Sequence, residues 1–131
     1  MENPAYKGLQ GWERVVAHFG HWPSFHDGEI LRCSLNHMGD SALSVLTWTM
    51  TSDVDERGYY ISKDHAVVHF SLHKLTRVDL FEFSSGSVIF GLKVRQDDGE
   101  HQIELDPCVG LSGTLRCQSV HVSIEAHPPS R

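Results

Sequence analysis

Residues 22–29 carry the side chains of this chain best suited to chemistry, in the order Trp-Pro-Ser-Phe-His-Asp-Gly-Glu. Together with the preceding His21, the side chains of His26, Asp27 and Glu29 are types that ligate divalent metal ions or exchange protons in acid–base catalysis. The proline keeps the tryptophan before it out of the α-helical region, and the glycine permits main-chain conformations closed to other residues. We therefore expect a shaped connection that forms either a binding or catalytic site or a specific structural corner.

A metal or acid–base site in this segment would need support from elsewhere, and the sequence offers no second cluster with ligand spacing. Asp and His side chains in turns more often hydrogen-bond to main-chain groups nearby. We therefore predict no catalytic residue, no metal site and no cofactor. The segment is interpreted first as a corner that fixes a helix to a sheet, and second as a partner-binding surface. The residues assigned to it are Trp22, Phe25, His26, Asp27 and Glu29.

Three of the ten histidines, at positions 65, 69 and 73, are spaced four residues apart. On a helix they would form one row, close enough to bind a metal ion. The alternation of residues 65–72 favours a strand instead, where four residues span about 13 Å, too far for two side chains to share one ion. The row is therefore predicted to be an exposed polar face. Nucleophile-elbow, phosphate-binding and dinucleotide-binding motifs are absent from the sequence, whereas a cysteine–histidine nucleophile pair stays open.

The balance of charges argues against a nucleic-acid partner. The 131 residues include 17 acidic and 11 basic side chains, for a formal net charge of −6, and a nucleic-acid-binding protein normally shows a basic patch. The length indicates one domain over residues 1–131. Residues 1–10 lack an apolar signal segment, and no apolar run approaches the roughly 20 residues of a membrane span. We predict a cytoplasmic protein without a membrane partner, whose reduced cysteines are small core residues: Cys33, Cys108 and Cys117.

Apolar spacing predicts one amphipathic helix from Leu9 to Phe19, ending at Gly20. Strand patterns follow over residues 30–38, 42–50, 65–72, 78–83, 88–94, 102–105 and 114–126. The phase of the alternation changes near Lys74, which indicates a bulge, a bend or a change of strand. The strand 102–105 is expected to stop before Pro107.

Helices do not alternate with strands in this pattern, so parallel βαβ units are not expected. The predicted fold is α+β and mostly β. It is a strongly curved or partly closed antiparallel sheet of about seven strands, with one N-terminal helix packed on it.

The order of these elements resembles the bacterial family immunity protein 50, a class of antidotes found with polymorphic toxins. The resemblance covers nearly the whole chain and rests on residues 19–30, where the run Trp-Pro-Ser-Phe-His-Asp is its most specific part. Residues 65–70, 78–83 and 109–117 support it. The chain departs from the family pattern at Gly28, where alanine is expected, and over residues 83–88, which replace an Asn/Gln-rich turn.

The resemblance implies a cytosolic, non-enzymatic immunity protein that binds and neutralises a cognate toxin protein. Two alternatives from the residues themselves stay open. One is a small metal-dependent enzyme that uses the side chains His21, His26, Asp27 and Glu29. The other is a structural dimerisation module, because a sheet of this size can leave an edge strand free for a homodimer.

Overall fold

The computed structural model describes residues 5–127, apart from the side chains at 50–52 and 60–62. Two short helices come first, η1 (Ala5–Gly8) and α1 (Trp12–Phe19). The strands that follow are β1 (Glu29–Ser34), β2 (Ser41–Val54), β3 (Tyr60–Phe81), β4 (Val88–Asp97), β5 (Glu100–Val109) and β6 (Ser112–Ala126).

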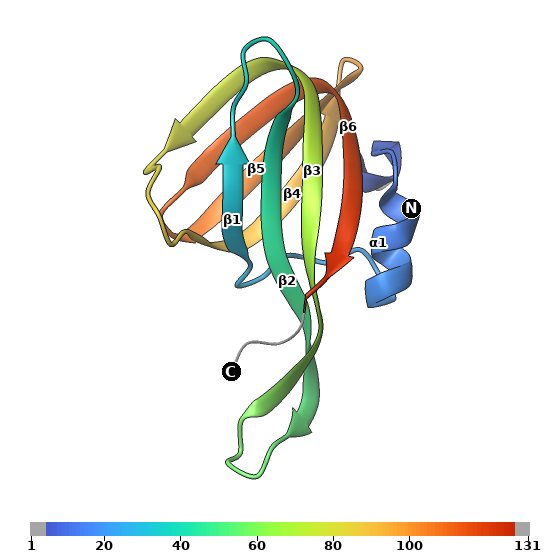
Figure 1. Ribbon diagram of the computed structural model, residues 1–131, viewed down its shortest axis with the longest axis vertical. Coiled ribbons are helices and arrows are strands. Elements are labelled where there is room, and N and C mark those ends of the chain that lie inside the picture. Colours follow the sequence, from blue (N-terminus) through green and yellow to red (C-terminus); the bar gives the residue numbers. More distant parts are fainter. Residues whose placement is uncertain (1–4, 128–131) are drawn as a thin grey trace.

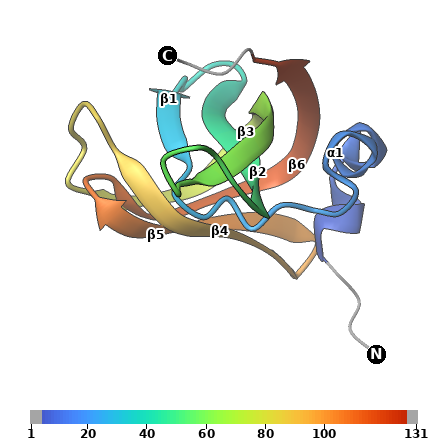
Figure 2. The ribbon, with the colours of Figure 1, turned by 90° about the horizontal axis from the view of Figure 1, so that it is seen from below.

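The strands form a closed antiparallel barrel in the order β1-β2-β3-β6-β5-β4 (Figure 1). Seen from below, α1 lies outside the ring, next to β6 (Figure 2). The prediction of a mostly β fold, with a curved antiparallel sheet and one N-terminal helix packed on it, is confirmed. No helix within residues 5–127 is long and apolar enough to cross a membrane.

Alternation along the strands fills the interior of the barrel with apolar side chains. On β3, Ala66, Val68, Phe70 and Leu72 are at most 1% exposed, and Val68 pairs with Val45 of β2. Full burial of a valine, leucine or phenylalanine side chain stabilises a fold by roughly 1.5–3 kcal/mol. The intervening histidines of β3 lie on the outer face, as predicted for the polar row. His69 contacts Ser44 and Glu125, and His73 contacts Asp40.

The predicted strands 65–72 and 78–83 are one strand, β3, so the described residues contain six strands instead of seven. The change of phase near Lys74 is a bulge. Leu75 pairs with Cys117 and Arg77 with Arg116 of β6, which leaves Thr76 outside the register. Lys74 itself has a positive φ of 58°.

Several predicted strand ends were wrong; the strand expected over residues 42–50, for example, continues to Val54. The strand expected over residues 30–38 ends at Ser34, and the strand expected to stop before Pro107 continues to Val109. The proline is tolerated because β5 pairs with β6 only as far as Leu105, while Pro107 pairs with Ile89 of β4. Beyond Leu105, the side of β5 that faces away from β4 pairs with no strand among the described residues. The missing N–H of Pro107 therefore interrupts no ladder on that side.

The N-terminal segment completes the barrel beside β6. Gln10 bridges to this strand in parallel fashion: its N–H donates to the Val120 carbonyl (3.0 Å), and its carbonyl accepts from the Val122 N–H (2.7 Å). The side chains of Val15 and Phe19, on the inner side of α1, are buried, in agreement with the predicted amphipathic helix. Gly20, at φ 84°, ends the helix as expected and donates its N–H to the Val16 carbonyl (2.7 Å).

Replacement of Gly11 by alanine should destabilise the protein more than the same change at Gly20. Both glycines have positive φ (93° and 84°), so each alanine costs about 1–2 kcal/mol in the left-handed conformation. Only at Gly11 would the new Cβ also collide with the Val122 carbonyl oxygen, whereas nothing lies within 4 Å at Gly20. We expect the loss of unfolding free energy to be at least about 2 kcal/mol larger at Gly11. Denaturant unfolding measures this difference, and equal losses would contradict the docking of the N-terminal segment on β6.

Candidate functional site

The segment 24–30 closes the barrel between β1 and β4 with its main chain. Three main-chain hydrogen bonds join them: Leu92 N–H to Ser24 O (3.2 Å), Ile89 N–H to Gly28 O (2.9 Å) and Ile30 N–H to Ser87 O (3.0 Å). Within the described residues, Glu29 and Val88 are the one ladder pair between β1 and β4. The interpretation of this segment as a structural corner is thus supported by the contacts of its main chain.

Aromatic rings anchor the segment to the core. Phe25 is 1% exposed and packs on Phe70 with ring centroids 5.9 Å apart. Trp22 meets Phe25 edge-on at 6.0 Å and stacks in parallel on Tyr6 at 4.8 Å. Rings at these separations contribute about 0.5–1.5 kcal/mol per pair beyond the area that they bury. A row of rings from η1 to β3 therefore holds the segment in place.

The unusual backbone conformations lie at Phe25 and Asp27, with φ of 64° and 62°, and Gly28 has no positive φ. The glycine is needed for space instead. An added Cβ would lie 3.0 Å from both the Phe25 carbonyl oxygen and the Cγ1 atom of Val45. The Gly28 N–H donates to the Phe25 carbonyl (2.9 Å) and so closes the turn.

His26 points away from the core while its neighbour Phe25 points into it. Its Nδ1–H donates to the Phe90 carbonyl (3.1 Å), and its ring meets the Phe90 ring edge-on at 4.9 Å. The Nε2 atom lies 3.5 Å from a carboxylate oxygen of Asp27, and the main-chain N–H donates to the Ser24 hydroxyl (3.3 Å). The side chains of His26 and Asp27 are both about half exposed (54% and 51%), so this ion pair contributes little to stability.

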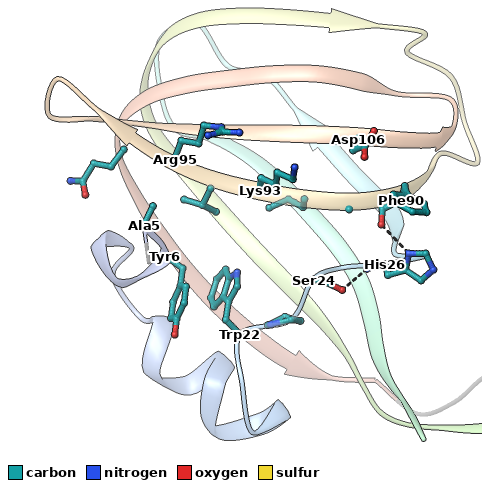
Figure 3. Close-up of a pocket in the computed structure, with 14 residues that line it drawn as sticks. Ala5, Tyr6, Trp22, Ser24, His26, Phe90, Lys93, Arg95 and Asp106 are labelled. Carbon is teal, nitrogen blue, oxygen red and sulfur yellow. Dashed lines mark hydrogen bonds between the residues drawn. The ribbon is translucent and has the colours of Figure 1, made fainter. Parts of the chain in front are cut away.

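Two hollows flank His26. The larger, of about 1080 Å³, has Tyr6 and Trp22 on one side and Lys93 and Arg95 of β4 on the other (Figure 3). The smaller, of about 230 Å³, has His21, Asp27 and Trp48 in its wall, and the Trp48 ring stacks on His65 at 5.6 Å. Ser24 and His26 belong to both walls. We call this continuous region the His26 surface; it comprises His21, Trp22, Ser24, His26, Asp27, Trp48 and Phe90.

The structure does not bring together the four residues of the alternative metal-dependent enzyme. His21, His26 and Asp27 share the smaller hollow, whereas Glu29 stands exposed at the start of β1, outside both hollows. Within residues 5–127, no three His, Cys, Asp or Glu side chains lie where they could hold one metal ion. The arrangement offers exposed rings, two imidazoles and one carboxylate for contact with a partner.

Sequence reasoning missed Phe90, which supplies both the carbonyl and the ring that orient His26. Phe90 is separated from His26 by 64 residues and lies where the pairing of β4 with β5 is irregular, between Ile89 and Gly91. The Phe90 side chain is 54% exposed, and the alternation of residues along the predicted strand does not reveal this exposure.

The cysteines do not share one environment. Cys117 is buried in the core, Cys33 is partly buried against it, and Cys108 is exposed, so the prediction of a core role was wrong for Cys108. Burial, together with the nearby Glu100 carboxylate, raises the pKa of the Cys117 thiol to about 11. Burial also raises the pKa of the Cys33 thiol above its ordinary value.

Truncation of the two phenylalanines of this region should destabilise the fold to very different extents. Phe25→Ala removes a buried ring that holds the corner and should cost about 3–5 kcal/mol of unfolding free energy. Phe90→Ala removes a ring that is 54% exposed and should cost less than about 1 kcal/mol. Thermal and denaturant unfolding of the two variants measure this contrast. A Phe25→Ala protein as stable as Phe90→Ala would show that the corner does not support the fold.

One thiol of the native protein should react rapidly with a disulfide reagent such as dithionitrobenzoate at pH 8. The thiolate is the reactive form, so the raised pKa values and burial of Cys117 and Cys33 protect these two, while Cys108 is open to solvent. After unfolding in denaturant, all three should react at similar rates. Cys108→Ser should abolish the rapid phase, and a rapid phase that persisted in this variant would contradict the placement of the cysteines.

Comparison of the chain with family models, with curated proteins and with solved structures finds no match. Membership of the immunity protein 50 family therefore stays a prediction from the resemblance.

Proposed function

We propose that this protein is a non-catalytic immunity protein that binds a cognate toxin protein through the His26 surface and so neutralises it in the cytoplasm. The observation that supports this most is the exposed pair of rings at His26 and Phe90. His26 belongs to the corner segment 24–30 and Phe90 to β4, and the main-chain hydrogen bonds of barrel closure join these two segments. An exposed aromatic pair held on a rigid frame has the character of a binding surface.

Rigidity is what makes this surface suited to tight binding. Ordering of flexible side chains and loops on association costs about 0.5–1.5 kcal/mol per immobilised side chain. Here the hydrogen bond from His26 to the Phe90 carbonyl orders the His26 ring before a partner arrives. The stacking of Trp22 on Tyr6 orders the Trp22 ring in the same way. The hollows on either side of His26 can receive protruding side chains of the toxin domain.

Charge assists the encounter with a toxin. The formal net charge of −6 attracts a basic partner, and such steering raises association rates more than affinity. Binding energy is expected to come from a few desolvated rings and their hydrogen bonds. The His26 imidazole can contribute as well, because its Nδ1–H is already bonded to the Phe90 carbonyl and its Nε2 faces solvent beside Asp27.

Co-expression with the toxin encoded beside this gene tests the proposal. The full chain should restore growth and co-elute with the toxin on gel filtration. His26→Ala and Phe90→Ala, made separately, should each weaken the complex at least about tenfold without loss of folding. Phe83→Ala is the matched control, because Phe83 is exposed to a similar degree (64%, against 54% for Phe90) but lies outside the His26 surface.

Absence of rescue together with absence of a complex would refute the proposal for that toxin. A complex that is weakened by Phe83→Ala and unaffected by the other two variants would keep the immunity function. It would move the interface away from the His26 surface.

A further inference from the structure

The last part of β3 has a free main-chain edge. β3 pairs with β2 up to Leu72, opposite Ser41, and with β6 as far as Phe81, opposite Ser112. Among the described residues, no strand pairs with the other edge of residues 74–81. In Figure 1 this yellow-green end of β3 runs along the upper left margin of the sheet, with β6 on its inner side. An edge of this kind offers unpaired N–H and C=O groups to another strand.

The edge is also apolar and accessible. Val78 is 40% exposed and Phe81 62% exposed, so both apolar side chains are accessible to a partner strand. A hollow of about 690 Å³ separates residues 74–78 from the connection between β1 and β2, where Leu35 and His37 stand opposite. The hollow gives an added strand room to approach.

The order of charges along this edge is symmetric about Val78. Arg77 and Asp79 flank it, and they are bonded to each other on the outer face (Nε to Oδ2, 2.6 Å). An antiparallel strand with the same sequence, centred on the same valine, therefore meets Arg77 with Asp79 and Asp79 with Arg77.

We propose that two copies of this chain form a dimer by antiparallel pairing of β3 with β3 across a two-fold axis at Val78. In this register Arg77 of each copy lies opposite Asp79 of the other copy. Cβ atoms of directly opposed residues in antiparallel sheets are about 4.5–5.5 Å apart, within reach of such a pair. The two valines meet at the axis, and the pairing in this register covers the residues on the C-terminal side of the bulge at Thr76.

The dimer face and the His26 surface lie at opposite ends of β1. Glu29, next to the corner, begins this strand, and Ser34, next to the hollow beside β3, ends it. Dimerisation therefore leaves the His26 surface open and does not depend on the proposed immunity function. The two proposals can fail separately.

Sedimentation equilibrium of the full chain, without any partner, tests the dimer. The mass should rise with concentration from 14.7 kDa toward twice that value. Arg77→Asp puts carboxylates opposite carboxylates, and Asp79→Arg puts guanidinium groups opposite each other, so each variant alone should remain a monomer. Mixing the two variants restores opposite charges at every position and should produce a heterodimer. The double variant Arg77→Asp/Asp79→Arg should dimerise with itself for the same reason.

Arg95→Asp is the matched control. It breaks an ion pair of the same length with Glu104 (2.6 Å), but this pair joins β4 to β5 and involves no residue of the β3 edge, so the mass should stay unchanged. Circular dichroism shows whether each variant is folded. If the single variants fail to fold, Val78→Cys in a Cys108→Ser background serves instead, and mild oxidation should give a disulfide-linked dimer.

A wild-type chain that stays at the monomer mass at every concentration overturns the proposal. So does a dimer that persists unchanged in both single variants, because the β3 edge then takes no part in it. Absence of a heterodimer on mixing the folded single variants would likewise exclude this register.

Discussion

The barrel depends on the main-chain hydrogen bonds that residues 24–30 make to β4. Without them the six strands would form an open sheet with unpaired edges at β1 and β4, because Glu29 and Val88 are the single ladder pair between these strands in the described residues. Unsatisfied main-chain groups next to a core are costly, so the chain needs a partner for this edge of β4. A connection that would otherwise be a loop supplies it, and Gln10 plays the same part beside Val120 and Val122 of β6.

The main chain and the individual side chains of residues 24–30 make different contacts, which explains the mixed composition of this segment. Its main chain pairs with β4, Phe25 fills the core, and Gly28 is small because Val45 and the Phe25 carbonyl approach it closely. The side chains left over, His26 and Asp27, face solvent on a backbone that they do not themselves have to hold. A half-exposed polar pair on a rigid backbone suits recognition of a partner, and the half exposure of Phe90 beside it strengthens that interpretation.

Much of the fold could be predicted from the sequence because it follows from local patterns. The alternation of Ala66, Val68, Phe70 and Leu72 gave the inner face of β3, and Gly20 gave the end of α1. The predictions failed where a residue distant in the sequence determines the local structure. Pro107 remains in β5 because its neighbour on one side is absent, and Phe90 orients His26 from 64 residues away. The main-chain contacts of the corner likewise depend on long-range bonds to β4, which residue types alone do not reveal.

Amide hydrogen exchange of the native protein tests barrel closure most directly. The N–H groups of Ile89 and Leu92 donate to carbonyls of the corner segment, and the Ile30 N–H donates from this segment to the Ser87 carbonyl. If closure holds the barrel together, they exchange as slowly as amides of the central β2–β3 ladder, near the rate set by global unfolding. If instead they exchange as fast as the Gly58 amide, which is bonded within an exposed turn, the corner opens independently of the fold and closure is not what the barrel depends on.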